Sequence, residues 1–249
     1  GAQRMKLEDL RKLHQKKYRD ELGYFLVEGE HLVLELQKAA KNDARLSGSE
    51  IYVTFEFGQW NSPFPVHVIN ARHMAQISET RAPQGIVAVV PMFGPLPPRV
   101  GERAGERAVC LHEIQDPGNL GTILRTLAWF GNFRCLLTPG SVEPFNAKVI
   151  RASMGAVFHV PVETDVPLAS LTARYPRIAC LDTRGTPITA ASFRDHDCYL
   201  FGSEAHGLPN AEAGAPAAAL FTIPGSGLIE SLNVAAAVNL CAYELTRAR

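Results

Sequence analysis

Short apolar runs recur after residue 108, and their rhythm restricts the folds open to this chain. The runs cover residues 108–112, 134–138, 158–162, 177–181, 198–202 and 220–224. Stretches with helical or loop character separate them. Strands that alternate with helices, and that are apolar without a period of two, are typical of a parallel sheet buried on both faces. Ligands bind such sheets beyond the carboxyl ends of the strands, so we expect functional side chains directly after the runs.

The chain is long enough for two domains. It has 249 residues, of which 46% are hydrophobic, and this length fits one large domain or two modest ones. A segment dense in Pro, Gly and charge is typical of a linker. We therefore predict an N-terminal domain over 1–94, a linker over 95–107 and an α/β domain over 108–249.

The first 94 residues predict a smaller α/β unit. A helix is expected from Glu28 to Lys41, with its apolar residues on one side. Asn70 can cap a short helix that carries Met74 and Ile77. Strands are expected over 51–57, 65–69 and 85–90.

The net charge of the chain does not indicate a charged partner such as nucleic acid. Lys and Arg number 25, as do Asp and Glu, so the formal net charge is zero. Segment 4–19 is locally basic but also contains acids. It fits an RNA-contacting face and an ordinary solvated helix equally well.

Cysteine spacing and hydropathy indicate a cytoplasmic protein. The five cysteines lack paired spacing, which argues against a disulfide framework or a zinc site and favours buried free thiols. No apolar run reaches the roughly 18 residues of a membrane span. The charged N-terminus lacks the apolar stretch of a signal peptide. We expect no membrane contact and no metal.

The segment 111–131, LHEIQDPGNLGTILRTLAWFG, predicts a strand end, a turn and then a helix. Its leucines and isoleucine recur at core-stripe spacing, which leaves Arg125 on the opposite face. Asn119 stands at the helix entrance, where it can cap backbone N–H groups. Gly131 suits a left-handed cap at the helix end. The segment does not contain the dinucleotide-binding glycine pattern, and the chain has no phosphate-binding loop motif.

Two further strands run into polar segments. CYLFGSEAHGLP, 198–209, places Gly202 and Glu204 directly after a strand, and a glycine there lets a ligand approach the backbone. LFTIPGSGLIESLNVAAAVNLCAYEL, 220–245, places a flexible loop after a strand. Ser231 is then expected to cap a helix whose apolar face includes Val238 and Leu245.

Together the three segments resemble the motifs of the SpoU/TrmH family of RNA 2′-O-methyltransferases, in the SPOUT superfamily. The first motif matches from Asn119 to Arg125, the second at FGSEAHGLP and the third at IPGSGLIESLNVAAA. The resemblance covers residues 108–249. More loosely, YFLVEGEHLVLEL and SETRAPQGIVAVV resemble the N-terminal substrate-binding domain of many members, which has an L30e/L7Ae-like fold.

The resemblance implies a fold, a cofactor and partners. It implies an α/β SPOUT domain with a trefoil knot, S-adenosyl-L-methionine as cofactor, RNA as substrate and a homodimer with an active site built from both chains. Backbone at Gly202, Ile223 and Leu232 would line the adenosine pocket, with Thr183 nearby. Ribosomal RNA is favoured over transfer RNA because a large N-terminal domain resembles ribosomal-protein folds.

The resemblance also implies catalytic roles. Arg125 would be the central catalytic residue, and it is sometimes described as a base. A guanidinium normally only donates, so Arg125 can equally grip a phosphate and stabilise the developing alkoxide. Ser231 and Asn233 would orient the ribose or Arg125. Asn119 would fix loops, and Glu204 would hold a polar group or a backbone donor.

Three alternatives remain open on the sequence. The enzyme could act on transfer RNA instead of ribosomal RNA. A non-catalytic RNA-binding factor could keep the same fold, although Arg125, Glu204, Ser231 and Asn233 are all present. A nicotinamide-dependent oxidoreductase would also use an α/β sheet, but the chain lacks its glycine fingerprint.

Overall fold

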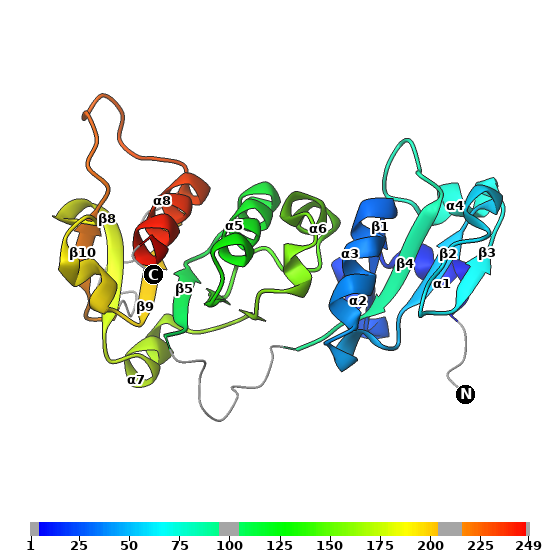
Figure 1. Ribbon diagram of the computed structural model, residues 1–249, viewed down its shortest axis with the longest axis horizontal. Helices are drawn as coiled ribbons and strands as arrows, with labels where there is room; N and C mark the ends of the chain where they lie inside the picture. Colours follow the sequence, from blue (N-terminus) through cyan, green and yellow to red (C-terminus); the bar gives the residue numbers. More distant parts are fainter. Residues whose placement is uncertain (1–4, 95–104, 204–215, 248–249) are drawn as a thin grey trace.

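A computed structural model describes residues 5–94, 105–203 and 216–247. In this part of the chain two sheets form, one on each side of residues 95–104 (Figure 1). The first contains β1, β4, β2 and β3 in that order, and the second contains β10, β8, β9, β5, β6 and β7. The strands of the first sheet are β1 (Tyr24–Glu28), β2 (Glu50–Val53), β3 (Val66–Val68) and β4 (Ile86–Pro91). Those of the second are β5 (Arg107–Leu111), β6 (Phe133–Leu137), β7 (Val162–Glu163), β8 (Ile178–Pro187), β9 (Cys198–Phe201) and β10 (Ala219–Thr222).

Helices cover both faces of both sheets. In the first part of the chain, residues 5–94, the helices are α1 (Leu7–Lys12), α2 (Lys16–Leu22), α3 (Glu30–Ala40), η1 (Ala44–Leu46), η2 (Phe55–Phe57) and α4 (Ala71–Ile77). In the second they are α5 (Pro117–Phe130), α6 (Ala147–Ser153), η3 (Ala156–Phe158), η4 (Leu168–Ser170), α7 (Leu171–Arg174), η5 (Ala191–Asp195) and α8 (Val234–Thr246). Helix α5 packs between α6 and α8 on one face of the second sheet. The opposite face packs against Leu168, Leu171 and their neighbours.

The second sheet is parallel throughout, as the apolar runs predict. Its strand β5 lies between β9 and β6. The next strands in sequence, β6 and β7, are added on one side of β5, and the later strands β8, β9 and β10 lie on the other side. Such a reversal of strand order is where ligands bind in open α/β sheets. The path from β9 to β10 includes residues 204–215, which lie outside the described residues. The trefoil knot therefore stays a prediction.

Several elements differ from their expected bounds. The strand expected over 51–57 ends at Val53, because Thr54 starts the 3-10 turn η2. The strand expected over 158–162 begins only at Val162, since Phe158 closes the 3-10 turn η3. The helix expected from Glu28 to Lys41 is α3, but it begins at Glu30 because Glu28 ends β1. The cap by Asn70, which accepts from the His73 N–H at 2.8 Å, is as expected. Gly131 has a φ of 77° and a ψ of 159°, so its positive φ suits glycine but is not a left-handed helical cap.

The two parts of the chain are joined by a buried contact. Arg19 of α2 donates from Nη2 to Glu143 Oε1 at 2.5 Å, and the Arg19 side chain is only 6% exposed. The Phe25 and Phe145 rings pack with centroids 4.5 Å apart. One hydrophobic cluster runs through this contact and includes residues from both sheets. Breaking one partner of a buried ion pair is costly, so this contact should hold the two parts in a fixed orientation.

The five cysteines are free and buried, as expected from their spacing. Burial raises the pKa of the Cys135 thiol to about 12 and that of Cys180 to about 11. Because a thiolate is the reactive form, these thiols are inert near neutral pH. Among the described residues, no helix combines the length and the apolar character needed to cross a membrane.

Candidate functional site

The parallel register brings the carboxyl ends of the central strands to one edge. Leu111 of β5 lies opposite Phe201 of β9 and opposite Leu137 of β6, while Phe201 lies opposite Leu181 of β8. The His112 N–H donates to the Phe201 carbonyl at 3.0 Å and forms the last rung of this ladder. Gly202 follows that rung directly. The edge therefore collects the segments that the sequence marks as polar.

The first and third motifs meet in a side-chain hydrogen bond. Asn233 Nδ2 donates to Asn119 Oδ1 at 3.0 Å, across 114 positions of the chain. Asn233 Oδ1 accepts from the N–H groups of Ala235 at 2.8 Å and Ala236 at 3.2 Å. Because these two contacts require an oxygen, they fix which end of the amide faces Asn119. The starts of α5 and α8 are thus held together.

The caps of these helices differ from the expected ones. Asp116, not Asn119, caps α5, and its Oδ1 accepts from the Asn119 N–H at 3.1 Å. Asn233, not Ser231, caps α8. Asp, Asn and Ser are all good N-cap residues, so the position at which each helix begins determines which residue caps it. The Asn119 side chain is left available for the contact with Asn233.

Arg125 lies on the outer face of α5, as the helical spacing predicts. Leu120, Ile123, Leu124 and Leu127 are buried beneath it, whereas Arg125 is exposed. Trp129, one turn further along the same face, is 83% exposed. An arginine on this face is accessible to a phosphate or to a second protein chain.

Gly202 and Ile223 directly follow β9 and β10, whereas Thr183 lies inside β8, which continues to Pro187 instead of ending near residue 181 as expected. Thr183 is exposed, and both its N–H and its hydroxyl donate to Asp182 Oδ1, at 2.6 Å and 3.3 Å. It lies where β8 and β10 lose register, since Cys180 pairs with Leu220 but the next pair is Thr186 with Phe221.

The segment after β10 supplies the remaining described residues. Ile223 packs partly buried against the core, while Ser231 and Leu232 are exposed beside Asn233. Leu228 and Ile229, in the same segment, are also exposed apolar side chains. Glu204 lies outside the described residues, so its predicted role is not placed.

The strand ends also contain residues that sequence patterns did not single out. Thr138 is buried after β6, and its Oγ1 accepts from the Glu113 N–H at 2.8 Å and lies 3.3 Å from His112 Nδ1. Glu113 has a φ of 51°, uncommon for a residue with a side chain and most frequent at constrained sites. Only their position directly after strands could have drawn attention to them.

Gly121 sets how closely α5 and α6 approach. A Cβ at this position would lie 2.4 Å from Ala152 Cβ and 2.7 Å from the Val149 carbonyl oxygen. No side chain fits at that separation. Gly121 is therefore a packing residue that lets α5, which carries the first motif, lie close to α6.

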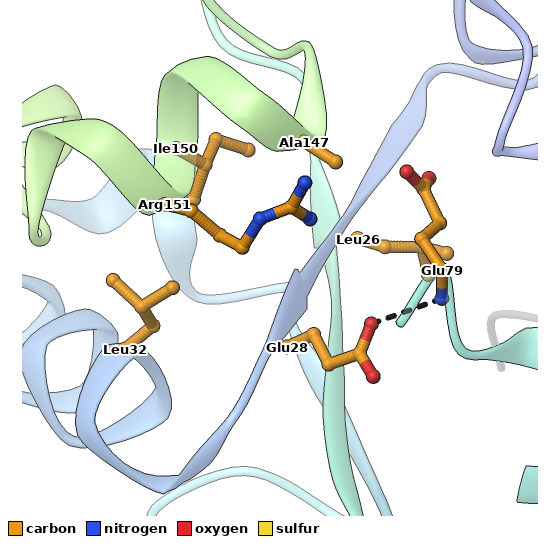
Figure 2. Close-up of a pocket in the computed structure, with 7 residues that line it drawn as sticks. All are labelled: Leu26, Glu28, Leu32, Glu79, Ala147, Ile150 and Arg151. Carbon is orange, nitrogen blue, oxygen red and sulfur yellow. Dashed lines mark hydrogen bonds between the residues drawn. The ribbon is translucent and has the colours of Figure 1, made fainter. Parts of the chain in front are cut away.

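A cavity between the two parts of the chain is too small for a cofactor. Its volume is about 10 Å³, roughly the space of one water. Figure 2 shows Arg151 of α6 extending toward β1 near Leu26, while Glu28 bonds to the Glu79 N–H. The lining residues are Leu26, Glu28, Leu32, Glu79, Ala147, Ile150 and Arg151. This cavity belongs to the joint between the two parts, not to the strand-end site. Within the described ranges, no three His, Cys, Asp or Glu side chains gather as a metal site.

Comparison with known proteins places this geometry in a family. The family model of SpoU rRNA methylases matches residues 106–243. The chain belongs to the SpoU rRNA methylase family. A second model, described as an MRM3-like substrate binding domain, matches residues 4–88. The SpoU match contains all three motifs.

Relatives of the same length support this assignment. The chain is 29% identical to the 23S rRNA (guanosine(2553)-2′-O)-methyltransferase RlmP of Bacillus subtilis, over 98% of this chain and 97% of the relative. It is 32% identical to a Synechocystis protein described as an uncharacterized tRNA/rRNA methyltransferase, over 97% of this chain and 90% of the relative. The structure of an AdoMet-bound rRNA methyltransferase from Sinorhizobium meliloti superposes with a TM-score of 0.82 at 26% identity, covering 97% of this chain and 94% of that chain. The chain is thus an AdoMet-dependent RNA methyltransferase of the SpoU family.

Proposed function

We propose that this SpoU methylase transfers a methyl group from S-adenosyl-L-methionine to a ribose 2′-hydroxyl of ribosomal RNA. The observation that carries the proposal is the Asn119–Asn233 hydrogen bond, which unites two motifs at the carboxyl edge of the sheet. The full-length likeness to a ribosomal RNA enzyme that methylates a 2′-oxygen supports the substrate. The division into domains at 1–94, 95–107 and 108–249 is part of the same proposal.

The cofactor is proposed to bind at the ends of β9 and β10 and against the middle of β8. Backbone at Gly202, Ile223 and Leu232 would hold it, with Thr183 nearby. Two features of this region fit the cofactor. Gly202 offers backbone without a Cβ at a strand end, and the segment after β10 presents exposed apolar side chains that an adenine ring can cover. S-Adenosyl-L-methionine supplies an already activated methyl group when bound.

Arg125 is proposed to act on the ribose oxygen by electrostatics. A guanidinium donates hydrogen bonds and offers no acceptor. From the outer face of α5 it would hold an RNA phosphate and stabilise negative charge that develops on O2′. Ser231 and Asn233 would orient the ribose or Arg125, and Asn119 would fix the loops. Glu204 would hold a polar group or a backbone donor.

We also propose that two copies of the chain pair through the outer faces of α5 and α8. Trp129 is 83% exposed, and Leu240 and Tyr243 are exposed on α8. The Phe130 and Tyr243 rings, 6.3 Å apart and edge to face, join the two helices into one surface. Exposed apolar patches of this kind mark interaction sites. A second copy would cover the surface and place Arg125 at the interface, which supports an active site built from both chains.

Methyl transfer to unmodified RNA transcripts tests the function. Wild-type protein is incubated with isotopically labelled S-adenosyl-L-methionine and with 23S, 16S or transfer RNA transcripts. The modified position is then mapped by its resistance to alkaline cleavage, which requires a free 2′-hydroxyl. We expect one protected ribose in ribosomal RNA. Label in transfer RNA alone would establish the alternative substrate, label on a base would contradict ribose chemistry, and RNA binding without transfer would indicate a non-catalytic factor.

A further inference from the structure

One edge of the first sheet presents an exposed aromatic side chain. Val53 ends β2 opposite Val68 of β3 and opposite Ile86, the first residue of β4. The segments after β2, after β3 and before β4 therefore emerge at the same edge. Phe55, in the first of them, is 88% exposed. An exposed ring presents its flat face to solvent, where a planar partner can stack on it.

The turn that carries Phe55 is tightly fixed. The Thr54 N–H donates to the Gly85 carbonyl at 2.9 Å, and the Gly58 N–H donates to the Phe55 carbonyl at 3.0 Å. The neighbouring Phe57 ring packs edge to face on Trp60, with centroids 6.0 Å apart. Gly85 has a φ of 95°, and a Cβ there would lie 2.5 Å from Thr54 Oγ1. Phe55 is thus displayed on a preorganised support, which reduces the entropy lost on binding.

The same edge carries two arginines. Arg81 lies in the segment 78–85, and Arg72 lies in the first turn of α4. Both are exposed, and neither forms an ion pair within the described part of the chain. The 78–85 segment is itself anchored, because the Glu28 carboxylate accepts hydrogen bonds from Ser78 Oγ, the Glu79 N–H and Thr80 Oγ1. An aromatic ring on the same edge as exposed guanidinium groups suits a base with its phosphate.

This edge lies on the same side of the molecule as the strand-end site. In Figure 1 the segment between α4 and β4 and the segment between β10 and α8 both project toward the top of the view. The Arg19–Glu143 contact and the Phe25–Phe145 packing join the two parts between them. An RNA held at the first edge can therefore extend toward the second.

We infer that Phe55 stacks on an unpaired base of the substrate RNA, and that Arg81 and Arg72 hold the adjoining phosphates. The inference rests on the proposed function, because it assigns an anchor for the same RNA. Unpaired nucleotides are the expected ligand, since bases stacked in a duplex leave no face free for a side chain. Phe55 is thus a substrate-binding residue remote from the methyl transfer.

Steady-state methyl transfer to the ribosomal RNA transcript that the wild type modifies tests this assignment. Loss of one base stack should raise KM for RNA about 5- to 100-fold in Phe55→Ala, with kcat at saturating RNA unchanged. Phe55→Trp should keep a near-wild-type KM. Leu34→Ala, which removes an exposed apolar side chain from α3, is the matched control and should leave both constants unchanged. Arg81→Ala should also raise KM and make binding less dependent on salt.

The outcomes separate this inference from the proposed function. If the wild type methylates no RNA, the proposed function fails. If the wild type is active and Phe55→Ala matches Leu34→Ala, the anchor is refuted while the function stands. A fall in kcat without a change in KM, or a changed oligomeric state in Phe55→Ala, would also refute it, the latter by assigning Phe55 to a protein contact. Thermal melting should give equal Tm values for wild type and Phe55→Ala, because the ring makes little contact with the fold.

Discussion

Asn233 donates from Nδ2 to Asn119 Oδ1 at 3.0 Å while its own Oδ1 caps α8. One side chain thus performs two tasks that can be separated by substitution. Asp116 performs the corresponding capping of α5, which frees Asn119 for the contact. The starts of the two helices are therefore connected by hydrogen bonds that run from one backbone to the other through two amides.

Asn233→Asp should reduce turnover without destabilising the fold. The carboxylate keeps an acceptor for the Ala235 and Ala236 N–H groups and suits a helix start. It cannot donate to Asn119, so two oxygens would face each other and the helix starts would separate. We expect turnover to fall at least about tenfold, the cost of roughly 1.4 kcal/mol, with Tm lowered by less than about 4 °C.

Asn146→Asp is the control for this change. Asn146 caps α6 by accepting from the Lys148 N–H at 2.9 Å, so the same chemical substitution is made at a cap outside the motifs. Methyl transfer and thermal melting are measured on both variants. Equal activity in the two would show that the Asn119–Asn233 bond does not support catalysis.

The sequence was most informative where one physical requirement determines the pattern. Buried parallel strands need continuous apolar runs, and all six occur at or near their predicted places. The positions of Arg125 on an outer helix face and of Asn70 at a cap follow from helical period and capping chemistry. The caps of α5 and α8 could not be fixed, because Asp116 and Asn119, or Ser231 and Asn233, are all acceptable caps.

Long-range contacts lay beyond what local patterns predict. The Asn119–Asn233 bond and the Arg19–Glu143 pair join residues more than 100 positions apart. The strand expected over 51–57 ends at Val53 because residues 55–57 form the 3-10 turn η2, and the Thr54 N–H bond to the Gly85 carbonyl, 31 positions later, anchors the start of that turn. The exposure of Phe55 follows from that turn, and an apolar run alone would have placed the ring in a core.

Arg125→Ala should lower turnover while cofactor binding persists. Removal of one donor from a developing oxyanion typically costs about 100- to 1000-fold in rate. Arg125→Lys should restore only part of this loss, because an ammonium lacks the planar fork of a guanidinium. Single-turnover methyl transfer and calorimetric titration with S-adenosyl-L-methionine measure the two properties. Lys148→Ala, which removes an exposed cation on α6, is the control. Near-normal single-turnover transfer by Arg125→Ala would exclude a catalytic role.

Trp129→Glu should dissociate the proposed dimer. A charge in the middle of an apolar interface would be desolvated without a partner, which is unfavourable by several kcal/mol. Light scattering during size-exclusion chromatography should show a shift from dimer to monomer, accompanied by loss of methyl transfer. Leu34→Glu, at an exposed apolar position on α3, is the control. A dimer that persists in Trp129→Glu would place the interface elsewhere, and a wild-type monomer would refute the pairing of copies.

Gly121→Ala should destabilise the fold beneath the first motif. The added Cβ would lie 2.4 Å from Ala152 Cβ, so α5 and α6 must move apart. Overpacking of this kind costs about 1–3 kcal/mol of unfolding free energy, and it outweighs the gain of roughly 1 kcal/mol from replacing a helical glycine by alanine. Urea unfolding measures the difference. Thr122→Ala, on the exposed face of the same helix, should be close to neutral. Equal or greater stability of Gly121→Ala would show that the two helices separate readily.

Glu163→Gln should destabilise the protein at neutral pH and less so in acid. The Glu163 carboxylate accepts from Arg174 at 2.8 Å and 2.5 Å and from Arg134 at 3.4 Å. Burial acts to raise the pKa of Glu163, but these two arginines outweigh it and hold the pKa below its ordinary value. A carboxyl whose pKa is lower in the folded state stabilises the fold fully above its unfolded pKa, near 4.3, and loses this contribution as pH falls through the folded value. We expect a deficit of about 1–3 kcal/mol at pH 7 that shrinks below about pH 4. Urea unfolding across this range, with Glu21→Gln at an exposed position as control, measures it. A deficit independent of pH would attribute the effect to packing instead of charge.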